Sequence, residues 1–250
     1  MRLLVNRLRL ADRWIPANTA RLLDAGCAAG LGTARFARKA TDTWGVDLVA
    51  GNLVAAHGRY PNIHFARGSV EQLPFADGTF DVVILTEVLE HVQDERATLN
   101  EIYRVMRPGA TVILTTPHAG LFAWLDPYNY GSVLRRHWPG TYRVLRRAGL
   151  ALSPTPDVPI HRHYARQDLQ RLLDTSSFAS SYTITKTFRS GCLMSPLVQN
   201  VFEGVLRLLP LRTTEILTTP LRFVYELDYW TPYGALAYHI ALCIKRTETP

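Results

Sequence analysis

The sequence predicts an α/β fold in which helices cover a doubly wound, mostly parallel sheet. Three observations support this prediction. Short apolar runs alternate with amphipathic runs of helical spacing through the first half of the chain, as in successive strand–helix–strand units. The alternation stops after Pro117 and resumes near Arg166. The chain has 250 residues, of which 47% are apolar, and this is enough to build one such domain with insertions.

The apolar runs place seven strands, each bounded by turn residues or by a helical run. These strands cover Arg21–Asp24, Thr43–Asp47, Ile63–Arg67, Asp81–Thr86, Thr111–Thr115, about 180–189 and about 237–245. Apolar residues at helical spacing predict helices over Gly32–Ala40, Ala50–Arg59, Glu95–Met106, Arg166–Asp174 and Pro196–Leu209. Pro108-Gly109 is expected to make a sharp turn into the fifth strand.

We expect a single domain over residues 1–250, with its core at residues 20–117. The segments at about 118–163 and 190–232 break the strand–helix rhythm. They are expected to be helical and loop insertions over the active site, placed where a substrate would be enclosed.

The composition favours a globular protein of the cytoplasm. The formal net charge is +7, and nearly all of the positive residues are Arg, which grips carboxylate and phosphate groups in a fork. Cys27, Cys192 and Cys243 lack metal-ligand spacing and fit a reducing compartment. Arginines interrupt Met1–Ile15, so it lacks the apolar centre of a signal peptide. No apolar run reaches the length of about 18 residues that would cross a membrane.

The turn after the first expected strand is the most informative motif. It reads Leu22-Leu23-Asp24-Ala25-Gly26-Cys27-Ala28-Ala29-Gly30 and precedes a helix. Its small residues let the backbone approach a ligand, and the helix N-terminus adds a positive dipole. The carboxylate of Asp24 suits a cationic or amine-bearing ligand and would repel a pyrophosphate. The turn therefore differs from the one that binds dinucleotides.

A second carboxylate, Asp47, ends the next expected strand. In a doubly wound sheet, an acid about 20 residues after the glycine-rich turn reaches the two hydroxyls of a ribose. Either feature alone is common. The two together predict a ligand that has an amine at one end and a ribose at the other.

With these motifs, residues 20–116 resemble the class I S-adenosylmethionine-dependent methyltransferases. Their first motif, Asp-x-Gly-x-Gly-x-Gly, reads Asp24, Gly26, Ala28 and Gly30 here. The resemblance implies a Rossmann-like methyltransferase fold, S-adenosylmethionine as cofactor and S-adenosylhomocysteine as product. It places Gly26 and Gly30 under the methionine part and Asp24 near its amino group. The cofactor-binding residues that it implies are Asp24, Gly26, Cys27, Ala28, Gly30, Asp47, Leu48, Ser69, Val70 and Thr86.

Within that set, the resemblance implies contacts of Asp47 with the ribose hydroxyls and of Leu48 with the adenine. Arg67-Gly68-Ser69-Val70 resembles the motif at the adenine edge, and Thr86-Glu87-Val88 would line the methionine. Two residues depart from the family pattern. Ala28 replaces a glycine, and Ser69 stands where an Asp commonly accepts a bond from the adenine amino group. Because Ser accepts without a charge, we expect weaker cofactor binding.

The segment Glu87-Val88-Leu89-Glu90-His91 follows the fourth expected strand, beside the expected cofactor. Methyl transfer requires an aligned acceptor and, for some acceptors, removal of a proton. Histidine accepts protons near neutral pH, so His91 is the candidate catalytic base. The alternative is that Glu90 and His91 only brace the following loop.

A metal site at this segment is a further alternative, although we expect none. Glu87, Glu90 and His91 would share one face if the segment were helical. That pattern is similar to the metal motif of small-RNA 2′-O-methyltransferases, which also need another histidine. The candidates for it are His118, His161 and His163. Mixed oxygen and nitrogen ligands would suit magnesium or manganese.

The acceptor contacts are expected in the later half of the chain. An apolar stripe on Pro196–Leu209 could be core, a substrate lid or a peripheral contact with a membrane surface. His161, His163 and Tyr164 could contact the acceptor or form a structural hinge. Five closely placed arginines could hold phosphate or carboxylate groups or form a solvated surface: Arg135, Arg136, Arg143, Arg146 and Arg147.

A looser resemblance extends through this half. Leu121–Tyr130, His161–Tyr164, Arg189-Ser190-Gly191 and Tyr229–Tyr238 resemble methyltransferases of bacterial polysaccharide and glycolipid gene clusters. This implies methyl transfer to an oxygen, ahead of nitrogen or carbon, of a small molecule, a glycan or a lipid-linked sugar.

Three other functions remain open. A metal-assisted RNA 2′-O-methyltransferase fits the basic charge, but no RNA-binding module is found, and no nucleic-acid partner is expected. A nicotinamide-dependent oxidoreductase would have a Gly-x-Gly-x-x-Gly turn, which the chain lacks. A non-catalytic scaffold of the same fold would bind cofactor poorly. The oligomeric state is not predicted.

Overall fold

The computed structural model describes residues 6–121, 123, 134–147, 161–191 and 227–247. The chain divides into two compact units. The first unit consists of Met1–Thr116, Arg166–Thr187 and Ala241–Pro250, and the second of Pro117–Ala165 and Phe188–Ile240. A single domain over residues 1–250 stays a prediction.

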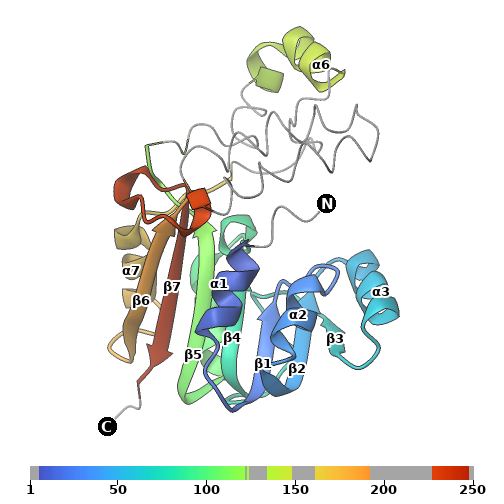
Figure 1. Cartoon of the computed structure of the whole chain (residues 1–250), viewed down its shortest axis with the longest axis vertical. Helices are drawn as coiled ribbons and strands as arrows, with labels where there is room; N and C mark the ends of the chain where they lie inside the picture. The colour runs from blue at the N-terminus through green and yellow to red at the C-terminus, as the bar shows by residue number, and fades with distance from the viewer. Residues whose placement is uncertain (1–5, 122, 124–133, 148–160, 192–226, 248–250) are drawn as a thin grey trace. The chain divides into compact units, whose positions relative to one another are not determined.

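A seven-stranded sheet, in the order β3-β2-β1-β4-β5-β7-β6, forms the centre of the fold (Figure 1). The strands from β3 to β5 pair in parallel, and Figure 1 shows β7 running opposite to its neighbours. The doubly wound, mostly parallel fold is therefore confirmed. The strand bounds are β1 Thr19–Ala25, β2 Ala40–Asp47, β3 His64–Arg67, β4 Phe80–Thr86, β5 Met106–Pro117, β6 Tyr182–Ser190 and β7 His239–Arg246.

The strand order reverses between β1 and β4, so the segments that follow these two strands diverge at the carboxyl edge of the sheet. Ligands of doubly wound folds bind at such a point. The register places Asp24 beside Gly45 of β2 and beside Ile84 of β4. Asp47, the last residue of β2, pairs with Arg67 of β3.

Helices lie on both faces of the sheet in the first unit. Figure 1 shows α1 and α2 in front of the sheet and α7 behind it. The helices of this unit are α1 Asn6–Trp14, α2 Leu31–Phe36, α3 Ala50–Arg59, the 3₁₀ helix η1 Leu89–His91, α4 Glu95–Val105 and α7 Arg166–Asp174. The second unit contains α6 Pro139–Arg147 and the 3₁₀ helix η4 Gly234–Leu236.

Two apolar layers hold these helices to the sheet. Consecutive strand side chains point to opposite faces, so Ile113 and Leu114 of β5 belong to different layers. One layer joins α1 and α2 to the sheet through Ala11, Ile15, Leu22, Phe36, Val82, Ile84, Ile113 and Cys243. The other joins α4 and α7 to it through Leu89, Leu99, Leu114, Leu169, Leu173, Leu242 and Ile244.

Two predicted helices extend too far at their C-termini. α2 ends at Phe36, and Ala40 instead begins β2, because parallel pairing with β1 starts at the Thr19–Ala40 pair. α4 ends at Val105, and Met106 begins β5, where it pairs with Phe80. In both places, pairing with a distant strand decides the boundary.

Pro108-Gly109 lies inside β5 instead of before it. Phe80 pairs with Met106, but Val82 pairs with Thr111, so the intervening residues of β5 form a bulge. Gly109 has a φ of 78°, which suits a glycine at a bulge. The predicted turn is thus absorbed into a longer strand.

The predicted helix over Pro196–Leu209 lies outside the described residues. Within the described ranges, no helix combines the length and the apolar character needed to cross a membrane.

Candidate functional site

The turn after β1 consists largely of residues in left-handed conformation. Gly26, Ala28 and Gly30 have φ values of 84°, 45° and 78°. A Cβ atom at Gly26 would lie 2.3 Å from Val88 Cγ2, and one at Gly30 would lie 2.9 Å from Phe65 Cζ. Both glycines are therefore needed. Ala28 adopts a conformation that is strained for an L residue, at the position where the family has glycine.

Asp47 is tied to this turn through the backbone. The amide of Ala28 donates to Asp47 Oδ2 at 2.9 Å. Asp47 Oδ1 accepts from the amide of Val49 at 2.8 Å and from Asn52 Nδ2 at 3.1 Å. These bonds fix the orientation of the carboxylate. Because a carboxylate has about four lone-pair sites, it can still accept from a ribose hydroxyl.

Asp24 is buried, with a relative exposure of 2%. Its Oδ2 atom accepts from Thr33 Oγ1, in α2, at 2.7 Å. The pKa of Asp24 is raised to about 7, mainly by burial and to a smaller extent by the charge of Asp47, against the lowering effect of the Thr33 bond. A nearby cation would favour the ionised form. The chemistry of this carboxyl therefore fits a ligand with an ammonium group.

Exposed apolar side chains follow β2. Leu48 is 63% exposed and Val49 is 56% exposed. Arg67 Nε donates a hydrogen bond to the carbonyl oxygen of Leu48 at 3.2 Å. This surface next to Asp47 suits a flat, apolar ring such as adenine.

Ser69 stabilises its own turn through two hydrogen bonds. Its Oγ atom accepts from the amide of Glu71 at 3.1 Å, and its carbonyl accepts from the amide of Gln72 at 3.1 Å. The hydroxyl keeps its proton and a second lone pair, so a bond to adenine remains chemically open. The neighbouring Val70 is half-buried.

The segment after β4 is anchored on β5. Thr86 ends β4 half-buried, and Glu87 has a left-handed φ of 53°. Thr115 Oγ1 donates to Glu87 Oε1 at 2.9 Å, and Thr116 Oγ1 donates to Glu90 Oε2 at 3.1 Å. Two consecutive threonines thus hold the two carboxyl groups of the Glu87–His91 segment.

His91 is the exposed member of this segment. Its side chain is 47% exposed, and its Nε2 atom lies 4.0 Å from Oε1 of the buried Glu90. Burial, followed by the charge of Glu87, raises the pKa of Glu90 well above its ordinary value. The arrangement presents an imidazole beside a carboxyl group that tends to hold its proton.

The helical face assumed for a metal site does not form. Only Leu89–His91 is helical, as a single 3₁₀ turn, and the left-handed Glu87 lies outside it. The three side chains are therefore not arranged at successive positions of one α-helix. The candidate fourth ligands His118, His161 and His163 belong to the second unit.

Cys27 is buried within the cofactor turn. Burial, with the charges of Asp24 and Asp47, raises its pKa to about 12. Cys27 is therefore a buried thiol that stays protonated and packs inside the turn.

In the second unit, His118 follows β5 and is buried. Its Nδ1 atom lies 3.0 Å from the carbonyl of Ala237. Since a carbonyl only accepts, Nδ1 carries the proton. Burial lowers the pKa of His118, and the charges of Arg189 and His163 add to this effect.

The arginine cluster lies partly on a helix. Arg143 and Arg147 belong to α6, where both are exposed. Exposed arginines suit either of the two expectations for this cluster, anion binding or a solvated surface.

Sequence reasoning missed the residues that orient the carboxylates. Thr33 binds Asp24, and Asn52 binds Asp47. Each lies in the first turn or two of the helix that follows its partner's strand. A polar side chain at that place was the available signal. Thr115 and Thr116 carried no local signal, because they meet Glu87 and Glu90 only through strand pairing.

Comparisons with known proteins agree with this geometry. Residues 23–114 match a family described as "Methyltransferase domain". A probable S-adenosylmethionine-dependent methyltransferase of Mycolicibacterium smegmatis is 26% identical over 167 residues, which are 65% of this chain and 53% of that protein. The malonyl-[acyl-carrier protein] O-methyltransferase of Serratia marcescens is 34% identical over 99 residues, 40% of this chain and 39% of that protein. The chain thus spans about half or less of the length of these curated relatives.

A solved structure shows the same fold. It is the 1,6-didemethyltoxoflavin-N1-methyltransferase of Burkholderia thailandensis, with bound 1,6-didemethyltoxoflavin and S-adenosylhomocysteine. The TM-score is 0.57 at 14% identity, over 99% of this chain and 79% of that one. The resemblance to S-adenosylmethionine-dependent methyltransferases is confirmed by these relatives, and the solved structure confirms the fold. The resemblance to glycolipid-cluster enzymes stays a prediction, and the matches favour none of the alternative functions.

Proposed function

Because the chain carries a class I S-adenosylmethionine-dependent methyltransferase domain, we propose that it transfers a methyl group to an oxygen of a small molecule. The observation that most supports the cofactor in this proposal is the position of two carboxylates, Asp24 and Asp47, on either side of the left-handed turn. Asp24 is buried beside the turn, and Asp47 accepts from its Ala28 amide. This pairing suits a ligand with an ammonium group and a ribose.

The cofactor would be held by the residues expected from the sequence. Gly26 and Gly30 leave room for it over the turn, and Asp24 would be ionised by its ammonium group. Asp47 would accept from the ribose hydroxyls. The remaining contacts would come from Cys27 and Ala28 through their backbone, Leu48, Ser69 and Val70 at the adenine, and Thr86 at the methionine.

The cofactor supplies a methyl group on a positively charged sulfur, which makes the methyl carbon electrophilic. His91 would accept the proton of the acceptor hydroxyl at Nε2 as the new carbon–oxygen bond forms and the carbon–sulfur bond breaks. Charge balances, because the sulfonium charge is lost as the histidine gains a proton.

The choice of oxygen is supported by one relative, which bears the name of an O-methyltransferase. The small size of the acceptor is part of the proposal. A glycan or lipid-linked sugar is the finer proposal, since exposed arginines of α6 could hold its phosphate or carboxylate groups. Peripheral contact with a membrane and a cytoplasmic location belong to the same proposal.

The most direct experiment uses S-adenosylmethionine with a labelled methyl group. The purified protein is incubated with this donor and a small-molecule extract, and the labelled product is identified. We expect label in an ether or ester oxygen. Label on nitrogen or carbon would overturn the oxygen assignment, and absence of transfer would favour a scaffold.

His91→Ala tests the catalytic base. We expect turnover to fall by about a hundredfold or more while cofactor affinity is unchanged, because general bases contribute on this scale. His64→Ala is the matched control, since His64 is exposed at the opposite, amino end of β3. An undiminished rate in His91→Ala would make His91 a structural residue.

A further inference from the structure

The loop between β3 and β4 is fastened to α4 by three side chains. Near its start, this loop contains Ser69 and Val70, which are expected at the adenine edge of the cofactor. The side chains are Glu71, Glu101 and Arg104, which we call the loop clamp. They form two separate attachments, one at each end of α4.

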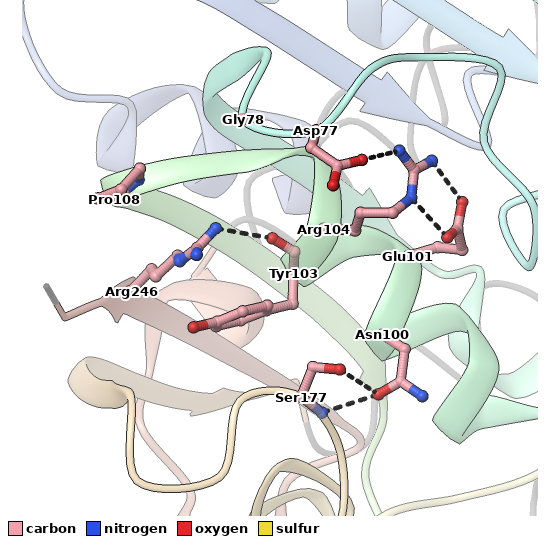
Figure 2. Close-up of a pocket in the computed structure, with 9 residues that line it drawn as sticks. All are labelled: Asp77, Gly78, Asn100, Glu101, Tyr103, Arg104, Pro108, Ser177 and Arg246. Atoms are coloured by element: carbon pink, nitrogen blue, oxygen red, sulfur yellow. Dashed lines mark hydrogen bonds and ion pairs between the residues drawn. The ribbon is translucent and has the colours of Figure 1, made fainter. Parts of the chain in front are cut away.

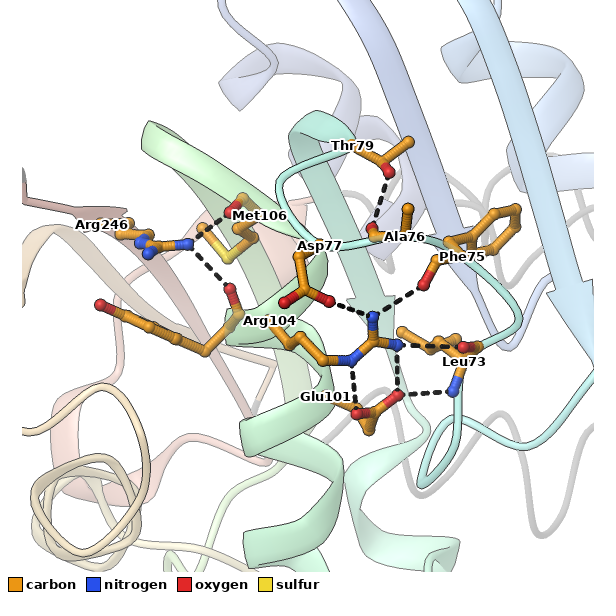
Figure 3. Close-up of polar contacts among 10 residues, drawn as sticks. Leu73, Phe75, Ala76, Asp77, Thr79, Glu101, Arg104, Met106 and Arg246 are labelled. Carbon is orange, nitrogen blue, oxygen red and sulfur yellow. Dashed lines mark hydrogen bonds and ion pairs between the residues drawn. The ribbon is translucent and has the colours of Figure 1, made fainter.

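Arg104 makes the attachment at the C-terminal end (Figure 3). Its Nη1 atom donates to the carbonyl of Phe75 at 2.7 Å and to Asp77 Oδ1 at 2.8 Å. Its Nη2 atom donates to the carbonyl of Leu73 at 3.1 Å and to Glu101 Oε2 at 2.7 Å, and Nε donates to Glu101 Oε1 at 2.7 Å. All five N–H donors of the guanidinium are used, and no other side chain has this fork of donors.

The hydrogen bonds to the backbone of the loop contribute more to this attachment than the ion pair with Asp77 does. Asp77 is 81% exposed, so its ion pair with Arg104 is screened by water and contributes little. Glu101 is 19% exposed, and its Oε2 atom also accepts from the amide of Leu73 at 2.8 Å. The amide and the carbonyl of Leu73 are thus both held from α4. The bond from Arg104 lowers the pKa of Glu101, which keeps this acceptor ionised.

Glu71 makes the attachment at the N-terminal end. Its Oε1 atom accepts from the amides of Gln93 and Asp94 at 2.6 Å and 3.2 Å. Asp94 is the N-cap of α4. In a capping box, a Glu three residues later would accept from the N-cap amide, but Ala97 stands there. Glu71 takes this role from the loop, and it thereby joins the adenine-side loop to the segment that follows His91.

The clamp borders solvent instead of the core. Arg104 and Glu101 line an open cavity of about 590 Å³ at the amino end of β4 (Figure 2). Arg246 crosses the same cavity wall, with its guanidinium 3.9 Å from the centre of the Tyr103 ring. A shorter side chain at Arg104 would leave space for water without opening a cavity in the apolar layers. Variants there should therefore fold.

We propose that the loop clamp positions the adenine-side loop before the cofactor binds. Glu71, Glu101 and Arg104 are positioning residues, since none of them lies at the cofactor turn. Without the clamp, the loop would have to be ordered during binding, which lowers affinity. The proposal rests on the expected adenine contacts of Ser69 and Val70 and not on the identity of the acceptor.

Arg104→Lys is the first test, because it keeps the charge and removes the fork. Arg107→Lys is the matched control. Arg107 donates to the Gly78 carbonyl and to Asp81, outside the segment between Ser69 and Asp77. In Arg104→Lys we expect the Leu73 amide to exchange at least about tenfold faster, and S-adenosylhomocysteine to bind about tenfold more weakly by calorimetry. Arg107→Lys should change neither value.

Glu71 provides a second test with a conservative rescue. Both bonds of its side chain go to Oε1, and the amide oxygen of Gln can accept both. We expect Glu71→Ala to weaken S-adenosylhomocysteine binding and Glu71→Gln to restore most of it. Adenosine alone should lose affinity by the same factor as S-adenosylhomocysteine in Arg104→Lys, because the change lies at the adenine end.

Unchanged S-adenosylhomocysteine affinity in Arg104→Lys and Glu71→Ala would overturn the clamp, even if the Leu73 amide exchanged faster. Equal losses in Arg104→Lys and Arg107→Lys would also overturn it. These readouts need no methyl transfer. A failure of the proposed oxygen methylation therefore leaves them intact, whereas a wild type that binds no S-adenosylhomocysteine would overturn both proposals.

Discussion

At the scale of single residues, the candidate cofactor site contains two carboxylates in different surroundings. Asp47 is half-buried and accepts three hydrogen bonds, from Ala28, Val49 and Asn52. Asp24 is buried and accepts one bond, from Thr33. The first carboxylate is oriented for hydroxyl groups. The protonation state of the second depends on nearby charges, because burial opposes its ionised form.

Asp47→Ala should weaken S-adenosylhomocysteine binding by roughly ten- to hundredfold, because the ribose hydroxyls lose a charged acceptor. Calorimetry measures this directly. Asp42→Ala is the control, since Asp42 lies in the same strand but pairs with Arg21 and His64. Equal affinities of Asp47→Ala and the wild type would sink the ribose assignment.

Asp24 should make stability depend on pH. The folded chain holds its proton up to about pH 7, whereas an unperturbed Asp releases it near 3.8. Between these values the folded state binds more protons than the unfolded state, so the free energy of unfolding falls as the pH rises. The wild type should therefore lose on the order of a few kcal/mol relative to Asp24→Asn between about pH 4 and pH 7.

Urea unfolding of both proteins at several pH values measures this difference. Comparison with Asp24→Asn removes the opposite contribution of carboxyl groups such as Glu101, whose pKa is lowered. A difference that stays constant across the range would show that Asp24 is ionised in the folded protein at low pH.

At the scale of elements, the bulge in β5 lets one strand pair with β4 on both sides of an irregular stretch. It lets Met106 pair with Phe80 and Thr111 pair with Val82, and it brings Thr115 and Thr116 to the carboxyl edge of the sheet. The strand therefore connects the C-terminus of α4 with the threonines that hold the segment Glu87–His91. A single glycine at the bulge permits this path.

Gly109→Ala should destabilise the protein by about 1–2 kcal/mol, the usual penalty for a left-handed L residue. Gly109 has a φ of 78° and nothing within 4 Å of an added Cβ, so contacts of the new methyl group with other parts of the protein add nothing to this backbone penalty. Gly58→Ala in α3 has equal space without a positive φ. It should stabilise by about 0.5–1 kcal/mol. Denaturant unfolding that shows the same sign for both variants would contradict the assigned conformation of Gly109.

At the scale of the whole molecule, the candidate cofactor site and the loop clamp both lie in the first compact unit. Ligand binding to this unit should be visible as thermal stabilisation of the protein. S-Adenosylhomocysteine at a hundred times its Kd should stabilise the folded state by about 2.7 kcal/mol. NAD should produce no shift, because the turn lacks the Gly-x-Gly-x-x-Gly pattern that lets the backbone approach a pyrophosphate. A larger shift with NAD in a thermal scan would favour the oxidoreductase alternative.

The sequence alone determined the order of the strands and of the helices α2, α3, α4 and α7 in the first unit, the turn from Asp24 to Gly30 and the acid at Asp47, but it missed α1. These features are local, since periodicity and motif spacing operate within one strand–helix unit. Only the tertiary structure decided where Ala40 and Met106 belong, because strand pairing with distant residues sets those boundaries. The same holds for the threonines that hold Glu87 and Glu90, and for the raised pKa of Asp24. Burial and long-range hydrogen bonds depend on which segments the fold brings together, and no local pattern encodes them.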